Sequence, residues 1–219
     1  MIRSLLKRSE THGALLECGG GAGFYTQRFL TDGYNVTCVD LSEYALKENY
    51  RQAVEHGLAD NLTLTCGDFV GSTSSLGRYY DHVVFIKVLH HFPSLTAIEA
   101  AVSAGVQTCR PGGRVIIFEP NGANILWKLL LSMVRDKASG RSKWFFEQNL
   151  RFTTPGNISR ILEKQNVHFT MQYHYVLPGF ILEKEFFGVG LLRLINRYLE
   201  QSILKRFAFN ISFIIEMAD

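Results

Sequence analysis

The stretch LLECGGGAGFYTQRF, from Leu15 to Phe29, decides the fold of this chain. It begins with an apolar run that ends in an acid, continues through four glycines within five residues, and closes with an amphipathic segment. Glycines at a strand-to-helix turn let the backbone approach a ligand closely, because no Cβ is in the way. A helix that starts after them presents free N–H groups and positive potential, which suits a phosphate or the carboxylate of an amino acid. The stretch therefore predicts a ligand-binding turn between a buried strand and a helix.

Strand-like and helix-like segments alternate on both sides of this turn. Apolar and β-branched runs predict strands at 13–18, 34–40, 61–68, 81–89, 114–120, 167–176 and 207–218. Helical periodicity predicts helices at 24–30, 42–57, 94–109 and 154–166, with Ser42 and Thr154 as caps of two of them. The order predicts an α/β fold with a doubly wound, mostly parallel seven-stranded sheet of the Rossmann-like kind. Ligands of such sheets bind at the carboxyl ends of the strands.

The length and composition of the chain suit one domain. Its 219 residues are 47% hydrophobic, which is enough for a sizeable core. We predict a single domain over 1–219, with a cofactor-binding core at 14–120 and helical cap segments at 121–154 and 177–206. The formal net charge of +3 is mild and gives no strong argument for a nucleic acid partner.

The cysteines and the start of the chain favour a cytoplasmic protein without a metal site. Cys18, Cys38, Cys66 and Cys109 show no CxxC spacing, and the first three lie in or at the ends of strand-like runs. We therefore expect reduced core thiols. Met1 to His12 lack the apolar core of a secretory signal. No apolar run approaches the ~20 residues of a membrane span.

The spacing of the glycines narrows the class of ligand. Gly19, Gly21 and Gly23 form G-x-G-x-G, whereas nicotinamide-binding folds use G-x-G-x-x-G. Glu17 stands two residues before the first of them. A carboxylate in that place would repel a pyrophosphate but attract the ammonium or sulfonium of S-adenosylmethionine. The turn therefore favours S-adenosylmethionine.

Two further acids stand at the ends of the second and third predicted strands. Asp40 lies close to the ~20-residue offset at which such folds place an acid on ribose hydroxyls. A carboxylate accepts both hydroxyls of a diol well. Asp68 stands where it can bind the amino group of an adenine, and the backbone N–H of Phe69 can face the ring. The chain thus offers one acid to each half of an adenosine.

Five segments together resemble the class I S-adenosylmethionine-dependent methyltransferases, close to the small-molecule group that includes the ubiquinone-type enzymes. They are LLECGGGAG, VTCVDLS, CGDF, DHVVFIKVLHHF and RPGGRVIIFEPN, in family order, between Leu15 and Asn121. The resemblance implies S-adenosylmethionine as cofactor and S-adenosylhomocysteine as product. The family usually has one or two helices before its first strand, where this chain has only residues 1–13.

The resemblance also assigns the cofactor-binding positions. Leu41, the neighbour of Asp40 in VTCVDLS, belongs to the predicted cofactor site. The other family positions correspond to Glu17, Gly19 and Gly21 at the methionine end, Asp40 at the ribose, Asp68 and Phe69 at the adenine, and Ile86 and Lys87 at the amino group.

Two histidines follow the fourth predicted strand, beside the expected reaction centre. Methyl transfer is an in-line displacement, in which the enzyme mainly holds the acceptor near the methyl group. A hydroxyl acceptor also benefits from a base, and histidine takes a proton near neutral pH. Either His90 or His91 is therefore a candidate general base. The alternative is that the pair is a structural feature of the family.

Other polar residues near this edge have two interpretations. Glu119 and Asn121, after the fifth predicted strand, either orient an acceptor or bond the neighbouring loop. His168 and His174 share a face of the sixth predicted strand, and we expect them on its polar face. No cluster of ligands supports a metal-dependent mechanism.

The acceptor is predicted to be small and hydrophobic. The fourth strand ends in IKVLHH, which lacks the Asn/Asp-Pro-Pro-aromatic motif of enzymes that methylate base amino groups, and no cysteine follows a proline. Both absences disfavour a nucleic acid acceptor. The segment after Asn121 instead interleaves bases with Trp127, Trp144, Phe145 and Phe146. It covers a hydrophobic or lipid-like acceptor, rests on an anionic membrane surface, forms a homodimer interface, or simply packs on the sheet.

The predicted function is therefore S-adenosylmethionine-dependent methylation, with oxygen favoured as the acceptor atom and carbon or nitrogen as variants. The alternative is a non-catalytic partner protein that binds S-adenosylmethionine on the same fold. A nicotinamide-dependent reductase is disfavoured by the glycine spacing.

Overall fold

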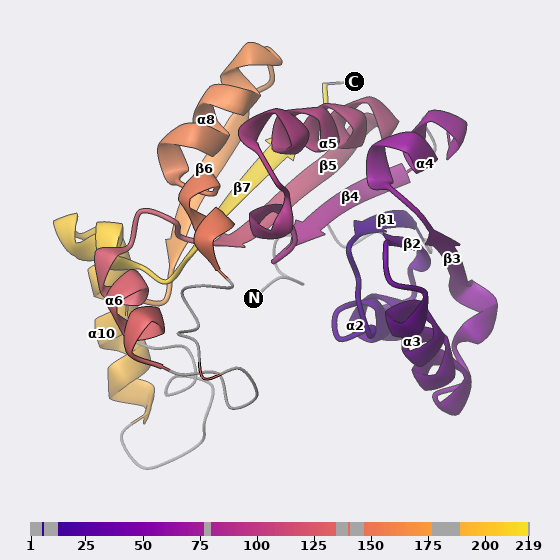
Figure 1. The fold of residues 1–219 in the computed structure, drawn as a ribbon, viewed down its shortest axis with the longest axis horizontal. Coiled ribbons are helices and arrows are strands. Elements are labelled where there is room, and N and C mark those ends of the chain that lie inside the picture. Colours follow the sequence, from indigo (N-terminus) through magenta and orange to yellow (C-terminus); the bar gives the residue numbers. More distant parts are fainter. Residues whose placement is uncertain are drawn as a thin grey trace.

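A seven-stranded sheet with the strand order β3-β2-β1-β4-β5-β7-β6 forms the centre of the molecule (Figure 1). The structure, a computed structural model, describes residue 6 and residues 13–76, 80–134, 140, 147–176 and 189–218. The strands are β1 (Ala14–Cys18), β2 (Asn35–Asp40), β3 (Leu62–Cys66), β4 (Tyr80–Ile86), β5 (Cys109–Pro120), β6 (Phe169–His174) and β7 (Asn210–Glu216). Strands β1 to β5 pair in parallel, and β7 is antiparallel to both of its neighbours, β5 and β6. The predicted mostly parallel, seven-stranded sheet is confirmed.

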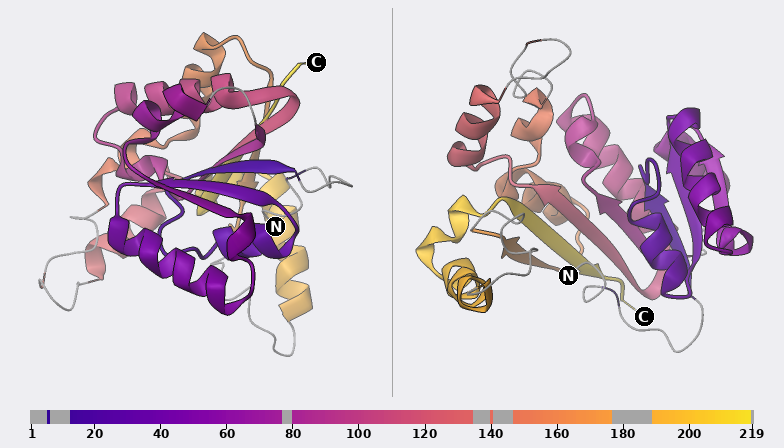
Figure 2. Two further views of the ribbon diagram at one scale, coloured as in Figure 1. Left: turned by 90° about the vertical axis from the view of Figure 1, so that its right-hand side faces the viewer. Right: turned by 90° about the horizontal axis from the view of Figure 1, so that it is seen from below.

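Helices cover both faces of the sheet (Figure 2). The α-helices are α2 (Thr26–Thr31), α3 (Glu43–Glu55), α4 (Phe69–Leu76), α5 (Leu95–Thr108), α6 (Ile125–Met133), α8 (Pro155–Lys164) and α10 (Val189–Gln201). Short 3₁₀ helices are η1 (Ala59–Asn61), η2 (Leu89–His91), η3 (Gln148–Phe152) and η4 (Ile203–Phe207). Helices α4, α5 and α8 pack on one face, and α2 and α3 pack on the other. The arrangement is doubly wound, as predicted.

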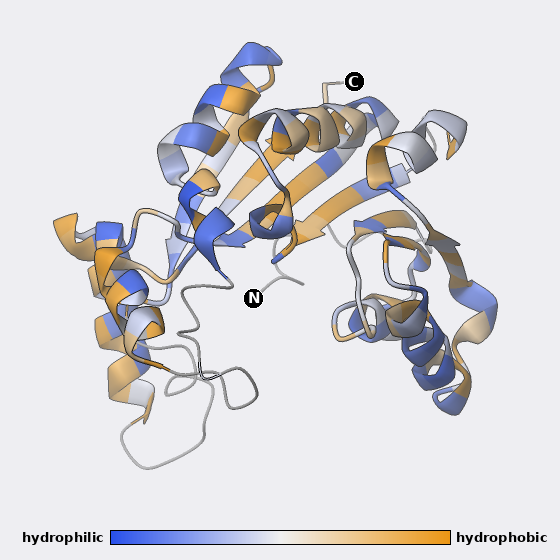
Figure 3. Ribbon diagram, in the orientation of Figure 1, coloured by the Kyte–Doolittle hydropathy of each residue, from blue (hydrophilic) through white to orange (hydrophobic). Residues whose placement is uncertain are grey.

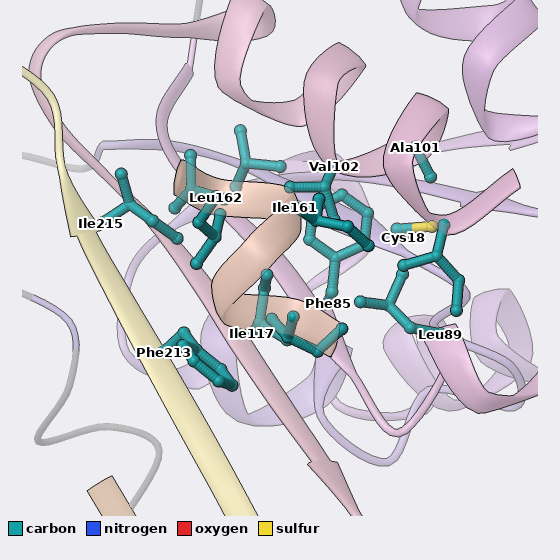
Figure 4. Close-up of a cluster of buried hydrophobic side chains, with 14 of the residues drawn as sticks. Cys18, Phe85, Leu89, Ala101, Val102, Ile117, Ile161, Leu162, Phe213 and Ile215 are labelled. Atoms are coloured by element: carbon teal, nitrogen blue, oxygen red, sulfur yellow. The ribbon is translucent and has the colours of Figure 1, made fainter. Parts of the chain in front are cut away.

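The central strands are apolar because helices bury them from both sides (Figure 3). In β4, Val83, Val84 and Phe85 are all fully buried. Their side chains alternate, so that Val83 and Phe85 enter one core and Val84 enters the other. Figure 4 shows Phe85 in the first of these cores, together with Val102 of α5 and Ile161 of α8.

Two helix starts confirm the caps predicted from the sequence. The Ser42 hydroxyl accepts a hydrogen bond from the Ala45 N–H (3.2 Å) at the start of α3. The Thr154 hydroxyl accepts one from the Asn157 N–H (3.2 Å) at the start of α8. Each bond satisfies a backbone donor that has no partner within the helix.

Helix α4 was not predicted from the sequence. Its residues, FVGSTSSL, include a glycine and four serines or threonines, all of which form helices less readily than alanine or leucine. The helix nevertheless begins where the Asp68 carboxylate accepts a hydrogen bond from the Gly71 N–H (2.8 Å). An acid at the cap position, followed by a packed Phe69, outweighs the weak propensity. The third strand is correspondingly shorter than predicted and ends at Cys66.

Strand β5 begins earlier than predicted, at Cys109 rather than Arg114. The RPGG turn expected before the strand lies within it, because the pairing with β4 shifts register between Tyr80 and His82. Gly112 lies in the shifted stretch with a φ of +70°, which favours glycine.

The chain after β5 is tied to the chain before β7. The Asn124 amide donates to the carbonyls of Phe207 (2.6 Å) and Ala208 (3.1 Å). The Trp127 ring lies 5.3 Å from the Phe209 ring. These contacts place the start of α6 beside the end of η4, although Asn124 and Phe207 are 83 residues apart in the sequence.

The predicted cap segments are described only in part. Residues 135–139, 141–146 and 177–188 lie outside the described residues, and with them Trp144, Phe145 and Phe146. The predicted domain limits stay a prediction. Within the described part of the chain, no helix is both long and apolar enough to cross a membrane.

Candidate active site

A cavity of about 740 Å³ lies at the carboxyl ends of β1 to β4, the edge of the sheet predicted to bind ligand. Its volume falls within the range that holds a cofactor-sized molecule. It is lined by Gly19, Gly21, Asp40, Leu41, Asp68, Phe69, Lys87 and His91, all of which the sequence predicted. The sequence did not predict the remaining lining residues, which include Ser42 beyond β2 and Phe92, Pro93, Ala97 and Ala100 around the start of α5.

The glycine turn brings its backbone to the floor of this cavity. Gly19 and Gly21 have φ values of +69° and +54°, in the left-handed region that favours glycine. A Cβ on Gly19 would lie 2.2 Å from a methyl group of Val88, so the turn rests directly against the chain that follows β4. A Cβ on Gly21 would meet nothing within 4 Å. The space above Gly21 is therefore open to a ligand.

Asp40 is held so that both of its oxygens face backbone donors. Oδ2 accepts a hydrogen bond from the Gly21 N–H (2.9 Å), and Oδ1 accepts one from the Ser42 N–H (2.8 Å). A carboxylate oxygen has two acceptor sites, so each keeps one for a further donor. The carboxylate thus links the glycine turn to the end of β2 and remains able to accept two hydroxyls of a diol.

Asp68 and Phe69 form the next part of the cavity wall. Asp68 Oδ2 accepts from the Gly71 N–H (2.8 Å) at the start of α4, which fixes the orientation of the carboxyl group. The Phe69 side chain is buried, with its ring 5.2 Å from the Phe85 ring. Because that ring packs in the core, a contact of the Phe69 backbone N–H with an adenine stays a prediction.

Glu17 does not line the cavity but lies beneath the glycine turn. Its carboxyl accepts a hydrogen bond from the Thr26 hydroxyl (2.5 Å), and a Cβ on Gly20 would come within 2.8 Å of Glu17 Oε2. Burial raises the pKa of Glu17 to about 7, and the nearby Asp40 adds to the rise. A direct contact of Glu17 with the methionine end of a cofactor stays a prediction.

The chain after β4 is anchored by Glu119, whose side chain is completely buried. Its Oε1 accepts hydrogen bonds from the Val88 N–H (2.7 Å) and the Leu89 N–H (2.8 Å). Just before them, Lys87 has a φ of 52°, an uncommon value for a residue other than glycine. Of the two interpretations of Glu119 from the sequence, the structure supports bonding to the neighbouring loop.

Asn121 also bonds the neighbouring chain rather than the cavity. Its amide donates to the Ala208 carbonyl (3.0 Å) and its Oδ1 accepts from the Ala123 N–H (3.0 Å). Ile86 is buried at the tip of β4 and, like Glu17, is not a lining residue.

The two histidines occupy different places. His91 lines the cavity, whereas His90 is buried behind it, with the ring centroids 4.0 Å apart. Glu119 Oε2 lies 2.7 Å from His90 Nδ1, and Glu147 Oε2 lies 3.8 Å from His90 Nε2. His91 is exposed at the cavity wall; partial loss of solvent lowers its pKa, and the neighbouring His90 lowers it further. Both effects favour the neutral ring, whose lone pair can accept a proton.

His174 lies away from this site and is not on a polar face, contrary to the prediction. It is buried, with Nε2 2.8 Å from the Ser212 hydroxyl and its ring 5.6 Å from the Phe118 ring. Burial lowers its pKa to about 4. The side chain is buried because it packs against the Phe118 ring of β5 and the Ser212 hydroxyl of β7, which lie on the same face of the sheet. His168 precedes β6 rather than lying in it.

The cysteines are free thiols, and one differs from the prediction. Cys18, Cys38 and Cys109 are buried as expected, whereas Cys66 is exposed because β3 is the edge strand of the sheet. Among the described residues, no group of three or more His, Cys, Asp or Glu side chains could hold a metal ion.

The cavity fits S-adenosylmethionine in its donor set. Asp40 can hold the ribose diol, Asp68 lies one strand further along for the adenine, and the open space above Gly21 leaves room for the rest. The cofactor supplies an electrophilic methyl group when bound.

Comparisons with known proteins agree with this fit. The family model described as a methyltransferase domain matches residues 16–115. The chain is 25% identical over 174 residues to the ubiquinone biosynthesis O-methyltransferase of Idiomarina loihiensis, covering 78% of this chain and 69% of that protein. Its fold is similar to that of a S-adenosylmethionine-dependent methyltransferase from Archaeoglobus fulgidus, with a TM-score of 0.63, 16% identity, and coverage of 93% of this chain and 86% of that chain.

A second solved structure shows the same fold with the cofactor present. It is phosphoethanolamine N-methyltransferase 2 of Haemonchus contortus in complex with S-adenosylmethionine, with a TM-score of 0.60 and 15% identity. The similarity covers 96% of this chain and 50% of that chain. Residues 16–115 thus form a methyltransferase domain with S-adenosylmethionine as its cofactor.

Proposed function

We propose that the enzyme methylates an oxygen atom of a small, hydrophobic acceptor, with His91 as the general base. The observation that carries this proposal is the position of His91 in the cavity wall, backed by a second imidazole that Glu119 fixes. The cavity joins the end of β4, where the two histidines follow, to the glycine turn. A hydroxyl placed beside His91 can therefore lie close to the transferable methyl group.

His91 has the protonation state that a base needs. A base must be unprotonated at the operating pH, and partial loss of solvent lowers the pKa of His91 below its ordinary value. When S-adenosylmethionine is bound, its methyl group would be the electrophile and a neutral thioether the leaving group, and the His91 ring would take the proton that the acceptor hydroxyl loses. Positioning the acceptor in line supplies most of the remaining rate enhancement.

His90 and Glu119 are proposed to orient His91 rather than to touch the acceptor. When Glu119 accepts the Nδ1–H of His90 at 2.7 Å, the tautomer of His90 is fixed and its ring cannot turn. His91 then packs against a rigid neighbour 4.0 Å away. In this proposal Glu119 orients His91 indirectly, through the His90 ring that lies between them.

The hydrophobic nature of the acceptor is supported by the chain after β5. Helix α6 carries exposed Ile125, Leu126, Leu129 and Met133, at the edge of the sheet where the strands β4 and β5 end. The similarity to a ubiquinone biosynthesis O-methyltransferase favours an oxygen atom on an apolar molecule, with carbon and nitrogen acceptors as variants. A cytoplasmic location is part of the proposal and is supported by the four free thiols.

The test uses S-adenosylmethionine labelled on its methyl group. The protein is incubated with it and an extract of the source cells, and the products are partitioned between organic solvent and water. We expect label in the organic phase, on an oxygen atom that chemical analysis of the product identifies. Label confined to water would overturn the hydrophobic acceptor.

A pair of histidine variants tests the base. His91→Ala should lower the rate by about a hundredfold while cofactor affinity stays within about threefold. His56→Ala is the control. It removes an exposed histidine at the C-terminal end of α3, which does not line the cavity, and should behave like the wild type. An unchanged rate in His91→Ala would remove the general-base role.

A further inference from the structure

Helix α10 leaves an apolar stripe exposed on the surface of the domain. Its packed face carries Val189 and Asn196, both of which are buried, and Glu200, whose Oε1 accepts from the Asn196 amide (2.8 Å). Its outward face carries Leu191 and Leu194, each 62% exposed, and Tyr198, 74% exposed. Residues at i, i+3 and i+7 lie on one side of a helix, so these side chains form a single apolar stripe. A surface helix ordinarily turns such a stripe toward the core.

A side-chain hydrogen bond helps to fix the way α10 docks on the domain. Glu200 Oε1 also accepts a hydrogen bond from the Tyr175 N–H (2.6 Å), just after β6. This bond ties the side of the helix that carries Asn196 and Glu200 to the end of the sheet and leaves the apolar stripe outward. Rotating the helix to bury the stripe would break the bond to Tyr175, whereas the bond between Asn196 and Glu200 lies within α10.

Bases accompany the apolar stripe. From Val189 to Phe207 the chain has four basic residues against one acid, Glu200. The bases are Arg193 and Arg197 on α10 and Lys205 and Arg206 on η4. In η4, Ile203 is 75% exposed and extends the apolar surface. We call the exposed residues of α10 and η4 the apolar-basic face.

The apolar-basic face lies near the edge of the sheet at which the cavity opens. Helix α10 follows the carboxyl end of β6, and η4 contacts Asn121 after the carboxyl end of β5 through the Arg206 carbonyl (3.3 Å). Figure 1 shows α6 and α10 together at this end of the molecule, and Figure 3 shows hydrophobic residues along both. The cavity lies at the carboxyl ends of β1 to β4 of the same sheet.

We propose that the apolar-basic face docks the enzyme on the surface of an anionic lipid bilayer. Leucine, isoleucine and tyrosine side chains would enter the interface between headgroups and acyl chains, while the bases lie at the level of the anionic headgroups. The proposal deepens the proposed function, on which it rests in one respect: a hydrophobic acceptor would reach the cavity from the bilayer. Docking itself requires no turnover and is measurable alone.

Charge favours a bilayer over a second copy of the chain. A symmetric dimer through this face would bring the same four bases of each copy together, with one acid each, already bonded, to offset them. An anionic bilayer instead offers opposite charge and apolar depth in one partner.

The test measures flotation of the full chain with vesicles. Wild-type protein is mixed with vesicles of phosphatidylcholine alone or with added phosphatidylglycerol, and floated on a density gradient at low and high salt. The variant Leu194→Glu with Tyr198→Glu places two acids on the apolar stripe. The matched control, Tyr50→Glu with Val54→Glu, makes the same change at the same spacing on exposed residues of α3. Cofactor binding by each variant, measured by calorimetry, reports whether it is folded.

We expect wild-type and control proteins to float with the anionic vesicles, more weakly at high salt. The Leu194→Glu, Tyr198→Glu variant should bind them at least about tenfold more weakly while still binding cofactor. Equal flotation of variant and wild type would overturn the proposal, as would a wild-type protein that stays unbound. A dimer that this variant dissociates, without vesicle binding by the wild type, would assign the face to self-association instead. Failure of methyl transfer into the organic phase, with flotation intact, would instead count against the proposed acceptor alone.

Discussion

Single residues set the affinity for the cofactor, and Asp40 is the one most open to test. Its two oxygens already hold the Gly21 and Ser42 N–H groups, so its position does not depend on a ligand. Asp40→Ala removes two charge-assisted acceptors and should raise the Kd for S-adenosylmethionine by roughly a hundredfold. Calorimetry measures the change, with Asp60→Ala, an exposed acid of η1, as the control. An unchanged Kd with an intact fold would show that Asp40 only braces the turn.

A second single residue, Glu17, makes the stability of the fold depend on pH. Its pKa is about 7 in the folded chain against an ordinary 4.5, so the folded state binds the proton more tightly than the unfolded state. The stability it contributes is complete below pH 4.5 and is lost as the pH rises through 7. Glu17→Gln, which cannot ionise, should therefore gain about 2 to 3 kcal/mol over the wild type between pH 5 and pH 8. Urea unfolding of the cofactor-free protein at both pH values measures this.

Glu48→Gln is the matched control for that measurement. Glu48 is partly exposed on α3, and its hydrogen bond with Arg51 lowers its pKa to about 2. The sign of its contribution is opposite, so this variant should show no gain at pH 8. A Glu17→Gln variant that follows the wild type at both pH values would mean that Glu17 is ionised in the folded chain.

The residues of the site could be predicted from the sequence where the backbone conformation or the ligand requires one kind of amino acid. Left-handed φ values require glycine at Gly19 and Gly21, and a diol requires an acid at Asp40. Positions that act through a neighbour were not predictable in the same way. Glu119 is 29 residues from His90 in sequence, and only the pairing of β4 with β5 brings the two together.

At the scale of elements, the chain between β4 and α5 is the part on which catalysis depends. Glu119 of β5 holds it by two backbone N–H groups and by His90. Glu119→Gln keeps one acceptor for the backbone but replaces the other oxygen with a donor, so His90 must change tautomer. We expect kcat to fall by about ten- to a hundredfold, with cofactor affinity within about threefold.

The pH profile separates this role from a merely structural one. The Glu119 charge raises the pKa of His91, so its removal should move the acid limb of kcat/KM to lower pH. The control is Glu99→Gln, which removes an exposed carboxylate of α5 that pairs with Lys164 (2.9 Å). An unchanged pH profile in Glu119→Gln would mean that the acid supports the fold only.

Elements were predictable from the sequence to the extent that one pattern dominated them. β4 and α3 have strong patterns, a buried β-branched run and a capped helix that ends before a glycine, and both were predicted. Helix α4 was missed because Gly71 and four Ser/Thr residues hide it. The early start of β5 was missed because a register shift, which belongs to two strands at once, absorbs the RPGG turn.

At the scale of the whole molecule, stability should decline from the centre of the sheet toward its ends. Val83 to Phe85 in β4 and Val115 to Ile117 in β5 are fully buried, whereas β3 is an edge strand with exposed side chains. We expect hydrogen exchange to be slowest at β4 and β5, faster at β3, and faster still in α10. Mass spectrometry of peptic peptides measures the order. Protection of α10 equal to that of β4 would contradict this gradient.

The described residues around the cofactor cavity all lie between Cys18 and Ala100, in the first half of the chain. The remaining half contributes the Glu119 anchor and the outer strands, but no described side chain to that cavity. We therefore expect the residues that bind the cofactor and most of those that select the acceptor to lie in different stretches of the chain. Libraries that randomise only the exposed positions of α6, such as Ile125, Leu126, Leu129 and Met133, should change what the enzyme methylates and leave its need for S-adenosylmethionine intact. Natural selection can change the substrate range in the same way, by substitutions at exposed positions after Pro120 that leave the cofactor-lining residues between Cys18 and Ala100 unchanged.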